Sequence, residues 1–424
     1  MSEINTIPKH WQLKKLGEVC DVLDNLRKPI NSTERQQRIA GKSQNALFPY
    51  YGATGQVGWI DGFLTEGEFI LIGEDGAPFL DIYKDKAYKI KGKTWVNNHA
   101  HILKGKKQFL IDDFALYYLN SINYRAFVNG TTRLKLTKSN LVEIPFVLPP
   151  LPEQLTIVSK IEELFSELDN GIAQLKTAQQ QLKVYRQSLL KWAFEGKLTS
   201  PIKNEKLRIT NDGLPEGWKL TKLGDYIENI NSGKSYRCDE RPPSKDEVGI
   251  IKVSSVTWGF FDEMESKTCF SKDLFNANYL VKKGDFLFSR ANTIEFIGAC
   301  VIVNKVDKKL MLSDKILRFT FSQDVLKEYA LYYLRSRKGR KQIEILSTGN
   351  QDSMRNIGQE KIRQIEFPYC SLKDQQLIVT ELESKLTVCD KIEETISQSL
   401  QQAETLRQSI LKKAFEGKLV KMKQ

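Results

Sequence analysis

Two pairs of adjacent acidic residues are the first candidates for catalytic chemistry. Glu74-Asp75 and Asp112-Asp113 could each help to hold a metal ion for hydrolysis, although a solvated loop carboxylate is the more frequent role of such residues. The sequence contains no G-x-x-x-x-G-K-[ST] phosphate loop and no G-x-G-x-x-G fingerprint. It also lacks the N/D-P-P-Y/F tetrapeptide expected of an amino-methyltransferase. We therefore expect a chain that is not itself an enzyme.

Thiols and imidazoles offer no alternative chemistry. The sequence has 6 cysteines and 3 histidines, no C-x-x-C pair, and no Cys/His cluster with the spacing of metal ligands. Scattered cysteines are typical of free thiols in a reducing compartment. The sequence also has no apolar run long enough to span a membrane and no signal segment at its start. We expect a cytoplasmic protein without a metal site.

Hydrogen-bonding side chains gather in several short polar segments of the first third of the chain. Arg, Lys, Asn, Gln, Ser and Thr on exposed loops are the groups that recognise base edges in duplex DNA. Asn97 or Asn98 could pair with adenine, and His99 or His101 could bind a guanine edge or a phosphate. A hydrogen-bonded internal turn is the alternative role of this segment. The candidate contacts here are Tyr51, Asn97, Asn98, His99, His101, Thr132, Arg133 and Lys135.

A second set of polar segments lies between residues 288 and 356. Arg290 and Arg355 are the side chains most suited to reach guanine or phosphate. The alternative for Arg290 is a structural ion pair with Asp314. The candidate contacts in this part are Ser289, Arg290, Asn292, Lys315, Asn350, Ser353 and Arg355.

The overall charge favours a polyanionic partner. The chain carries a formal net charge of +12, has a pI near 9.1, and is 41% hydrophobic and 27% charged. This composition predicts a globular protein, and the basic excess favours nucleic acid over other partners. A generic basic surface is the alternative, and charge alone does not exclude it.

The sequence contains an internal duplication. The segment 186–198 recurs almost unchanged at 407–419, an offset of 221 that runs back without a gap to residues 141 and 362. Shorter repeats precede it in each copy, at Trp11–Glu18 and Trp218–Asp225, and at Ala115–Leu119 and Ala330–Leu334. The order is therefore a variable domain, a helical block, a second variable domain and a second helical block.

The helical blocks predict two long helices that pair. From Glu153 to Phe194 there is no proline and only one glycine, Gly171. About 42 such residues would form a helix of roughly 63 Å. A narrow heptad seam cannot bury itself, so we expect the two helices to pack antiparallel around a pseudo-two-fold axis, although each could instead be a core helix of its own domain. The seam positions are Ile161, Leu168, Leu175, Leu182 and Leu189, then Leu382, Cys389, Ile396, Ala403 and Ile410.

The variable blocks predict mixed, strand-rich domains. Apolar strands are expected at Phe69–Ile72 and Cys300–Val303, and helices near 114–120 and 327–335. The fold class is therefore α+β, with two mixed α/β domains separated by the paired helices. The expected boundaries are 1–150 for the first domain, 151–200 for the first helical block, 201–371 for the second domain and 372–424 for the second helical block.

These features together resemble the specificity subunit of type I restriction-modification systems, and the resemblance covers nearly the whole chain. It is carried by Leu148-Pro-Pro-Leu-Pro-Glu-Gln154, by the twin R-Q-S-[LI]-L-K-x-A-F-E-G-K-L segments, and by the openings Ile7–Trp11 and Leu214–Trp218. One departure is visible: the second copy reads Cys370-Ser-Leu-Lys-Asp-Gln375 where the first has Pro149–Gln154. We expect this change to loosen the helix start without abolishing the helix.

The resemblance implies a role for each part. The variable domains would be target-recognition domains, each reading one half of a split site in double-stranded DNA. The paired helices would set the spacing and dock two methyltransferase subunits, through which restriction and translocase subunits would join. S-adenosylmethionine, ATP and Mg would belong to those partners, and this chain would bind no cofactor.

Two other classes of function remain open from the residues. A coiled-coil scaffold without DNA readout would explain the helices but not the divergent basic domains. A nuclease or methyltransferase hidden in a variable domain would be revealed by activity of the purified chain with Mg²⁺ or a methyl donor.

Overall fold

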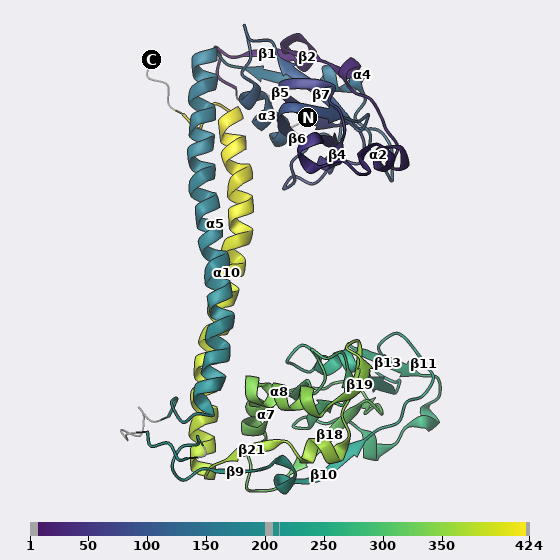
Figure 1. Cartoon of the computed structure of the whole chain (residues 1–424), viewed down its shortest axis with the longest axis vertical. Helices are drawn as coiled ribbons and strands as arrows, with labels where there is room; N and C mark the ends of the chain where they lie inside the picture. The colour runs from purple at the N-terminus through teal and green to yellow at the C-terminus, as the bar shows by residue number, and fades with distance from the viewer. Residues whose placement is uncertain (1–6, 200–206, 212, 421–424) are drawn as a thin grey trace. The chain divides into compact units, whose positions relative to one another are not determined.

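The computed structural model describes residues 7–199, 207–211 and 213–420, without the side chain of Asn350 (Figure 1). The chain divides into two compact units. The first unit consists of Met1–Thr177 with Ile396–Gln424, and the second consists of Ala178–Thr395. Each unit therefore contains one globular domain, part of one long helix and part of the other.

The globular domain of the first unit is built on a six-stranded sheet in the order β2-β7-β5-β6-β3-β4. All its pairs are antiparallel except β3 with β6. The predicted apolar strand lies inside β5, where Phe69 faces Ile90 and Ile70 faces Leu103. The elements are β1 (Gln12–Lys15), α1 (Leu16–Val19), β2 (Cys20–Val22), α2 (Ser32–Ile39), β3 (Phe48–Gly52), β4 (Gly55–Ile60), β5 (Thr65–Gly73), β6 (Ala87–Val96), β7 (Ala100–Gly105), α3 (Asp112–Ser121), α4 (Lys138–Val142) and β8 (Pro145–Leu148), with β1 and β8 forming a separate pair.

The globular domain of the second unit is assembled from smaller sheets. Their strand orders are β10-β18-β14-β16, β11-β13-β12-β17, β15-β20-β19 and β21-β9. The predicted strand at 300–303 is β16, and the predicted helix at 327–335 is α7. The elements are β9 (Lys219–Lys222), β10 (Ile227–Ser232), β11 (Cys238–Asp239), β12 (Gly249–Ile251), β13 (Ser266–Cys269), β14 (Phe286–Ser289), β15 (Ala291–Asn292), β16 (Cys300–Ile302), β17 (Leu310–Met311), β18 (Ile316–Phe321), α7 (Lys327–Arg335), α8 (Arg337–Leu346), β19 (Thr348–Gln351), β20 (Met354–Asn356), α9 (Gln359–Arg363) and β21 (Glu366–Tyr369).

The two predicted long helices are present as α5 (Leu151–Ala193) and α10 (Leu372–Phe415). In the first unit Arg407 of α10 forms an ion pair with Asp169 of α5 and lies over the ring of Phe165. In the second unit Arg186 of α5 contacts Asp390 of α10 at 2.7 Å. Arg407 and Asp390 are the repeat equivalents of Arg186 and Asp169. The two ion pairs are therefore the same contact, with the roles of α5 and α10 exchanged.

The helix segments run antiparallel within each unit. In the first unit the start of α5 packs with the end of α10, around Ile157, Ile161, Ile410 and Phe415. In the second unit the end of α5 packs with the start of α10, where Leu189 and Leu382 belong to one buried core. Helix α5 continues through Gly171 without interruption. The predicted mixed α/β fold with two repeated domains and paired long helices is confirmed.

A buried glutamine ties the start of each helix to its own globular domain. Gln154 accepts a hydrogen bond from the Ile111 backbone N–H at 3.0 Å, and its amide donates to the carbonyls of Phe109 and Pro149, both at 2.8 Å. Its repeat partner Gln375 is also fully buried. Gln375 accepts from the N–H of Leu326 (2.9 Å) and donates to the carbonyls of Asp324 (3.0 Å) and Cys370 (2.9 Å). A glutamine is needed at this repeat position because its amide pairs with backbone groups that would otherwise be buried without partners.

The end of each helix is fixed by a glycine that contacts a domain opening. Gly196 and Gly417 have φ of +70° and +68°, the left-handed conformation that ends many helices. A β-carbon on Gly196 would lie 2.6 Å from Pro215, and one on Gly417 would lie 2.3 Å from Pro8. The twin E-G-K-L segments and the proline of each opening are thus parts of one repeated contact.

The start of α10 shows how the departure from the repeat is accommodated. Ser371 replaces a proline of the first copy, and its hydroxyl accepts a hydrogen bond from the Asp374 backbone N–H at 3.2 Å. This is an N-cap, which satisfies a backbone donor at the helix start. The expectation that the changed sequence would keep its helix is confirmed. Helix α10 begins at Leu372, the repeat position of Leu151 where α5 begins, so the expected loosening of the start is not seen.

Candidate nucleic-acid interface

The polar segments of the first domain meet at one end of its sheet. The Asn97 N–H donates to the carbonyl of Tyr51 at 3.0 Å, which joins β3 to the turn between β6 and β7. The Glu74 N–H donates to the carbonyl of His99 at 2.7 Å, and the Leu136 N–H donates to that of Glu74 at 2.7 Å. Four segments that are distant in sequence therefore form one surface.

Two carboxylates organise the cations of this surface. Glu74 contacts Lys135 Nζ at 3.0 Å and Arg27 Nη1 at 2.5 Å. Asp75 contacts Arg133 Nη2 at 2.9 Å and His99 Nδ1 at 2.7 Å. Partial burial acts to raise the pKa of Glu74, but the hydrogen bonds from Lys135 and Arg27 outweigh it and hold that pKa below its usual value. These acidic residues pair with cations, and the described residues contain no cluster of three or more potential metal ligands.

His101 requires a correction, because its side chain lies inside the domain. It is fully buried, with Nδ1 2.7 Å from Asp24 Oδ2 and Nε2 2.8 Å from the Leu136 carbonyl oxygen. Both ring nitrogens are therefore occupied by groups of the same domain. The predicted contact of His101 with a base or phosphate is therefore wrong in this structure, and its role is to join the sheet to the loop before α4.

For Asn97, the structure favours the alternative role of a hydrogen-bonded internal turn over the predicted contact with a base. Asn97 is buried, and its Oδ1 accepts the His99 backbone N–H at 2.8 Å. Tyr51 is half-buried and packs against the ring of Tyr88. His99 is partly exposed and stays a candidate contact. The exposed candidates of this surface are Asn98, Thr132, Arg133 and Lys135.

The polar segments of the second domain also converge. Strand β15 pairs with β20, so that Asn292 faces Arg355. The Arg290 N–H donates to the Lys315 carbonyl at 2.9 Å, and the Ile294 N–H donates to that of Asp352 at 2.8 Å. The three predicted segments therefore form one surface around the β15-β20-β19 ladder.

The two arginines on which the sequence prediction relied most differ in this surface. Arg290 donates from Nε to Asn356 Oδ1 at 3.4 Å and forms no ion pair within the described part of the chain, whereas Asp314 accepts from Ser235. Arg355 is held by its own hairpin and by the end of α8, through the carbonyls of Gly349 (3.0 Å), Ser347 (2.9 Å) and Glu344 (3.4 Å). Arg290 keeps its place as a candidate contact, while the guanidinium of Arg355 is committed to shaping the loop.

The other candidates of this surface divide by exposure. Ser289 is fully buried in β14, so its predicted contact with DNA is wrong in this structure. Lys315 and Ser353 are exposed, and Asn292 is half-buried. The prediction for Asn350 falls on a side chain outside the described residues.

Two features of this surface escaped the sequence prediction. Helix α8 carries a short basic run in which Arg337, Lys338 and Lys341 are exposed. The loop before β13 presents Trp258 and Phe260 to solvent. The signals were present as R-K-G-R-K and T-W-G-F-F, but neither segment stands out until the fold brings it beside the polar loops.

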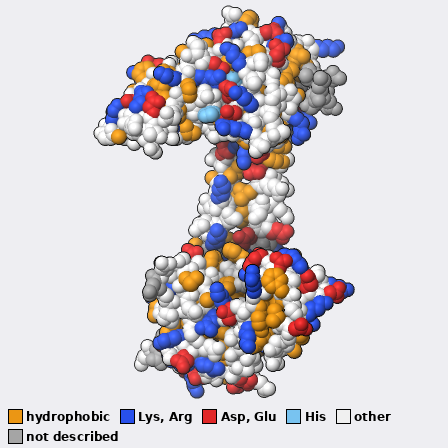
Figure 2. All heavy atoms as spheres, turned by 90° about the vertical axis from the view of Figure 1, so that its right-hand side faces the viewer, with side chains coloured by type: hydrophobic (Ala, Val, Ile, Leu, Met, Phe, Trp, Pro, Cys, Tyr) orange, Lys and Arg blue, Asp and Glu red, His pale blue; other side chains and the backbone are white. Residues whose placement is uncertain are grey.

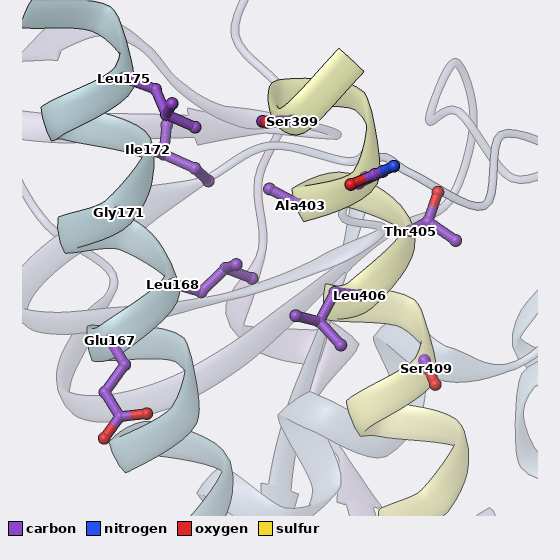
Figure 3. Close-up of a pocket in the computed structure, with 11 residues that line it drawn as sticks. Glu167, Leu168, Gly171, Ile172, Leu175, Ser399, Ala403, Thr405, Leu406 and Ser409 are labelled. Atoms are coloured by element: carbon purple, nitrogen blue, oxygen red, sulfur yellow. The ribbon is translucent and has the colours of Figure 1, made fainter. Parts of the chain in front are cut away.

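The helix pair of the first unit has a hollowed apolar face. A groove of about 640 Å³ lies between α5 and α10. Figure 3 shows Leu168 and Ile172 on one wall, opposite Ala403 and Leu406 on the other. The small side chains at Gly171 and Ala403 leave this space unfilled, and Leu406 is half exposed.

No helix among the described residues is long and apolar enough to cross a membrane.

Comparison with known proteins identifies the family. The type I restriction modification DNA specificity domain matches residues 8–177 and again 215–402. The putative type I restriction enzyme specificity subunit S.HindORF215P of Haemophilus influenzae is 28% identical over 407 residues, which cover 92% of this chain and 91% of that protein. The EcoKI specificity subunit of Escherichia coli K12 is 28% identical over 310 residues, which cover 71% of this chain and 63% of that protein.

Solved structures share the fold. A chain from the work described as "Structural basis underlying complex assembly and conformational transition of the type I R-M system" has a TM-score of 0.68 at 16% identity, covering 97% of this chain and 99% of that one. The HsdS subunit from Thermoanaerobacter tengcongensis has a TM-score of 0.56 at 16% identity, covering 99% of this chain and all of that one. With the specificity domain matched twice over most of its length, the chain belongs to the family of type I restriction-modification specificity subunits.

Proposed function

We propose that this protein is the DNA-reading subunit of a type I restriction-modification enzyme, in which each globular domain reads one half of a bipartite site. The observation that carries the proposal is the convergence of polar loops in both repeat copies. In each copy, segments far apart in sequence form one surface with exposed cations, such as Arg133 and Lys135 in the first and Lys315 in the second. Side chains of these types bind phosphates and base edges.

The long helices would serve as a spacer and as a docking surface. A continuous helix such as α5 would act as a stiff connector, and two readers joined in this way would recognise two half-sites at a fixed separation. Linking the readers also raises affinity, because the second half-site is bound at high effective concentration. Half-exposed apolar residues on the helices, Leu406 in the first unit and Tyr185 and Ile392 in the second, would contact two methyltransferase subunits.

Catalysis would belong to the partners of this cytoplasmic subunit. The carboxylates Glu74 and Asp75 of the first candidate surface are paired with cations, which leaves them less suited to hold a catalytic metal ion. S-adenosylmethionine would bind the methyltransferase subunits, and ATP and Mg would serve the restriction subunits that join the complex. This chain would then contribute sequence recognition and assembly alone.

The proposal is tested by equilibrium binding of the protein, alone and with its methyltransferase subunit, to duplex DNA at several salt concentrations. A reader that neutralises phosphates is expected to lose affinity steeply as salt rises and to prefer one duplex sequence over others. Absence of DNA binding by the assembled complex would favour the scaffold alternative. DNA cleavage or methylation by the purified chain alone would instead support a hidden catalytic domain.

Replacing Arg290 by alanine is expected to weaken specific DNA binding by roughly 1–3 kcal/mol. The side chain makes one long hydrogen bond, to Asn356, so its loss should leave the fold intact. The matched control is Lys222→Ala. It removes one cation from an exposed ion pair on the β9–β21 sheet, away from the β15-β20-β19 surface. An unchanged dissociation constant for Arg290→Ala would remove this residue from the interface.

A further inference from the structure

The second domain presents two exposed aromatic side chains beside its candidate reading surface. The exposed fraction is 60% for Trp258 and 58% for Phe260. Aromatic side chains usually bury most of their surface, so two on one short loop mark an interaction site. Figure 2 shows hydrophobic side chains gathered on a face of this domain, with charged side chains of both signs around them.

The aromatic loop is joined to the reading strands. The amide of Asn292 lies 3.5 Å from Thr257 Oγ1, and Asn292 faces Arg355 across the β15–β20 pair. The indole of Trp258 meets the ring of Phe296 edge-on, with centroids 5.5 Å apart. Phe296 belongs to the same loop as Ile294, whose N–H is bonded to the hairpin between β19 and β20. The aromatic side chains are thus continuous with the polar surface.

The loop is also held in place. Gly259, at its tip, has φ of +86°, and its carbonyl accepts from Arg335 Nη2 at 2.7 Å. Arg335 also donates to the carbonyl of Cys300 at 2.7 Å, which anchors the loop to β16. An aromatic pair that is exposed yet fixed loses little conformational entropy when it binds a partner.

Cations on a neighbouring helix favour DNA as the occupant, whereas Glu263 and Glu265, which follow the aromatic pair, accept hydrogen bonds from the Asp307 backbone N–H and from the Ser254 hydroxyl. Arg340 of α8 donates to the backbone carbonyls of the loop that carries Phe296, including those of Ile294 and Glu295. The same helix carries the exposed cations Arg337, Lys338 and Lys341, and the loop that Arg340 holds carries Phe296, the ring that Trp258 meets. A fixed aromatic surface flanked by cations is suited to a nucleic acid, because bases and methyl groups meet the rings while phosphates meet the cations.

We propose that Trp258 and Phe260 form a non-polar contact with the bases of the half-site that the second domain reads, next to phosphate contacts from α8. The inference rests on the proposed function and adds to it a contact type that the polar candidates lack. Aromatic or other apolar side chains recognise thymine methyl groups in the major groove, or wedge between base steps and unstack them.

The test uses the complex of the full chain with its methyltransferase subunit. Dissociation constants are measured for a duplex carrying the complete site, and for the same duplex with only the second half-site scrambled. Trp258→Ala and Phe260→Ala are each expected to raise the constant for the complete site roughly tenfold or more, with little change for the scrambled duplex. Trp258→Phe, which keeps a ring, should recover part of the loss.

The matched control is Leu220→Ala. Leu220 is 52% exposed in the same unit but lies in β9, which pairs with β21 ahead of α10. Its removal is expected to leave both constants unchanged. Photo-crosslinking of 5-iodouracil at each thymine of the half-site then locates the contact, and a crosslink to the 258–260 loop is the expected result.

The possible results distinguish failure of the proposed function from failure of the aromatic contact. If the wild-type complex does not discriminate the two duplexes, the proposed function fails. If it does, and the alanine variants bind like wild type, the aromatic contact is wrong while the proposed function stands. Loss of methyltransferase assembly in these variants, without a change in the DNA contact, would make the loop a protein-docking surface and overturn the inference.

Discussion

Replacing Gln375 by leucine is expected to lower the free energy of unfolding of the second unit by about 3 kcal/mol or more. Leucine is similar in size but cannot hydrogen-bond, so the Leu326 N–H and the carbonyls of Asp324 and Cys370 would lose their partner. An unsatisfied buried polar group costs roughly 1–3 kcal/mol. Hydrogen exchange followed by mass spectrometry on the full chain measures the effect region by region.

The repeat provides the control. Gln154→Leu breaks the same three bonds in the first unit, so each variant should speed exchange in its own unit by roughly a hundredfold and leave the other unit near the wild-type rate. Equal acceleration in both units by either single variant would contradict the assignment of each glutamine to a separate unit. Wild-type exchange rates in both variants would show that the buried amides contribute little.

Removing the carboxylate of Asp24 is the second change with a large expected effect. Asp24 pairs with the buried ring of His101 at 2.7 Å and with Arg27 at 3.1 Å. Losing the carboxylate leaves the guanidinium of Arg27 without one of its partners in a largely buried site and the ring of His101 without its hydrogen bond, so Asp24→Ala is expected to destabilise the first unit by about 3 kcal/mol. Exchange in β7 and in the loop before α4 should report it. Asp21→Ala, at an exposed carboxylate of β2 whose contact with Lys106 spans 3.9 Å, is the matched control and should have little effect.

The same ion pair predicts a pH dependence. Burial acts to raise the pKa of Asp24, but the hydrogen bond and charge of His101 and the charge of Arg27 outweigh it, so the pKa lies below its usual value. The folded carboxyl is then more acidic than the unfolded one, near 3.9. Its contribution to stability is therefore fully present above about pH 4 and is lost as pH falls through the folded pKa. The difference between wild type and Asp24→Ala should narrow below pH 4, and a difference that persists unchanged at lower pH would contradict this origin.

The sequence predicted the helices and the repeat well because their signals are periodic and local. Heptad spacing through Leu182 and Leu189 specifies one buried face, and the second copy repeats it. The sequence also showed where each helix starts and ends, but it did not show which residues the helix ends contact. The partners of Gln154 and Gly417 lie 45 and about 400 residues away in the chain, and only the fold shows that they are Phe109 and Pro8.

The candidate contacts were predicted as clusters but not as individual side chains. Asn98 and His101 belong to one polar segment, yet one is exposed and the other is buried. The difference arises because His101 lies in β7, opposite Ile72, while Asn98 lies in the preceding turn. The acceptors that hold His101 are 77 and 35 residues away, so no local pattern could reveal them.

Arg355 illustrates the opposite difficulty. Its sequence neighbours are polar, which favours a DNA contact, but the hairpin folds back so that its guanidinium meets the carbonyls of Ser347 and Gly349. Trp258 was passed over because a single aromatic residue in a loop carries no periodic signal. Its significance depends on the exposure and neighbours that the fold gives it.

Mapping of DNA methylation across the genome of cells that carry the complete system tests the central claim most directly. The proposed function, with two recognition domains held apart by a helical spacer, predicts one methylated motif made of two specific half-sites, separated by a fixed number of unspecified base pairs. Exchange of the second domain alone should change one half-site and leave the other unchanged. A continuous motif, or a motif that survives exchange of either domain, would contradict the account of two readers in one chain.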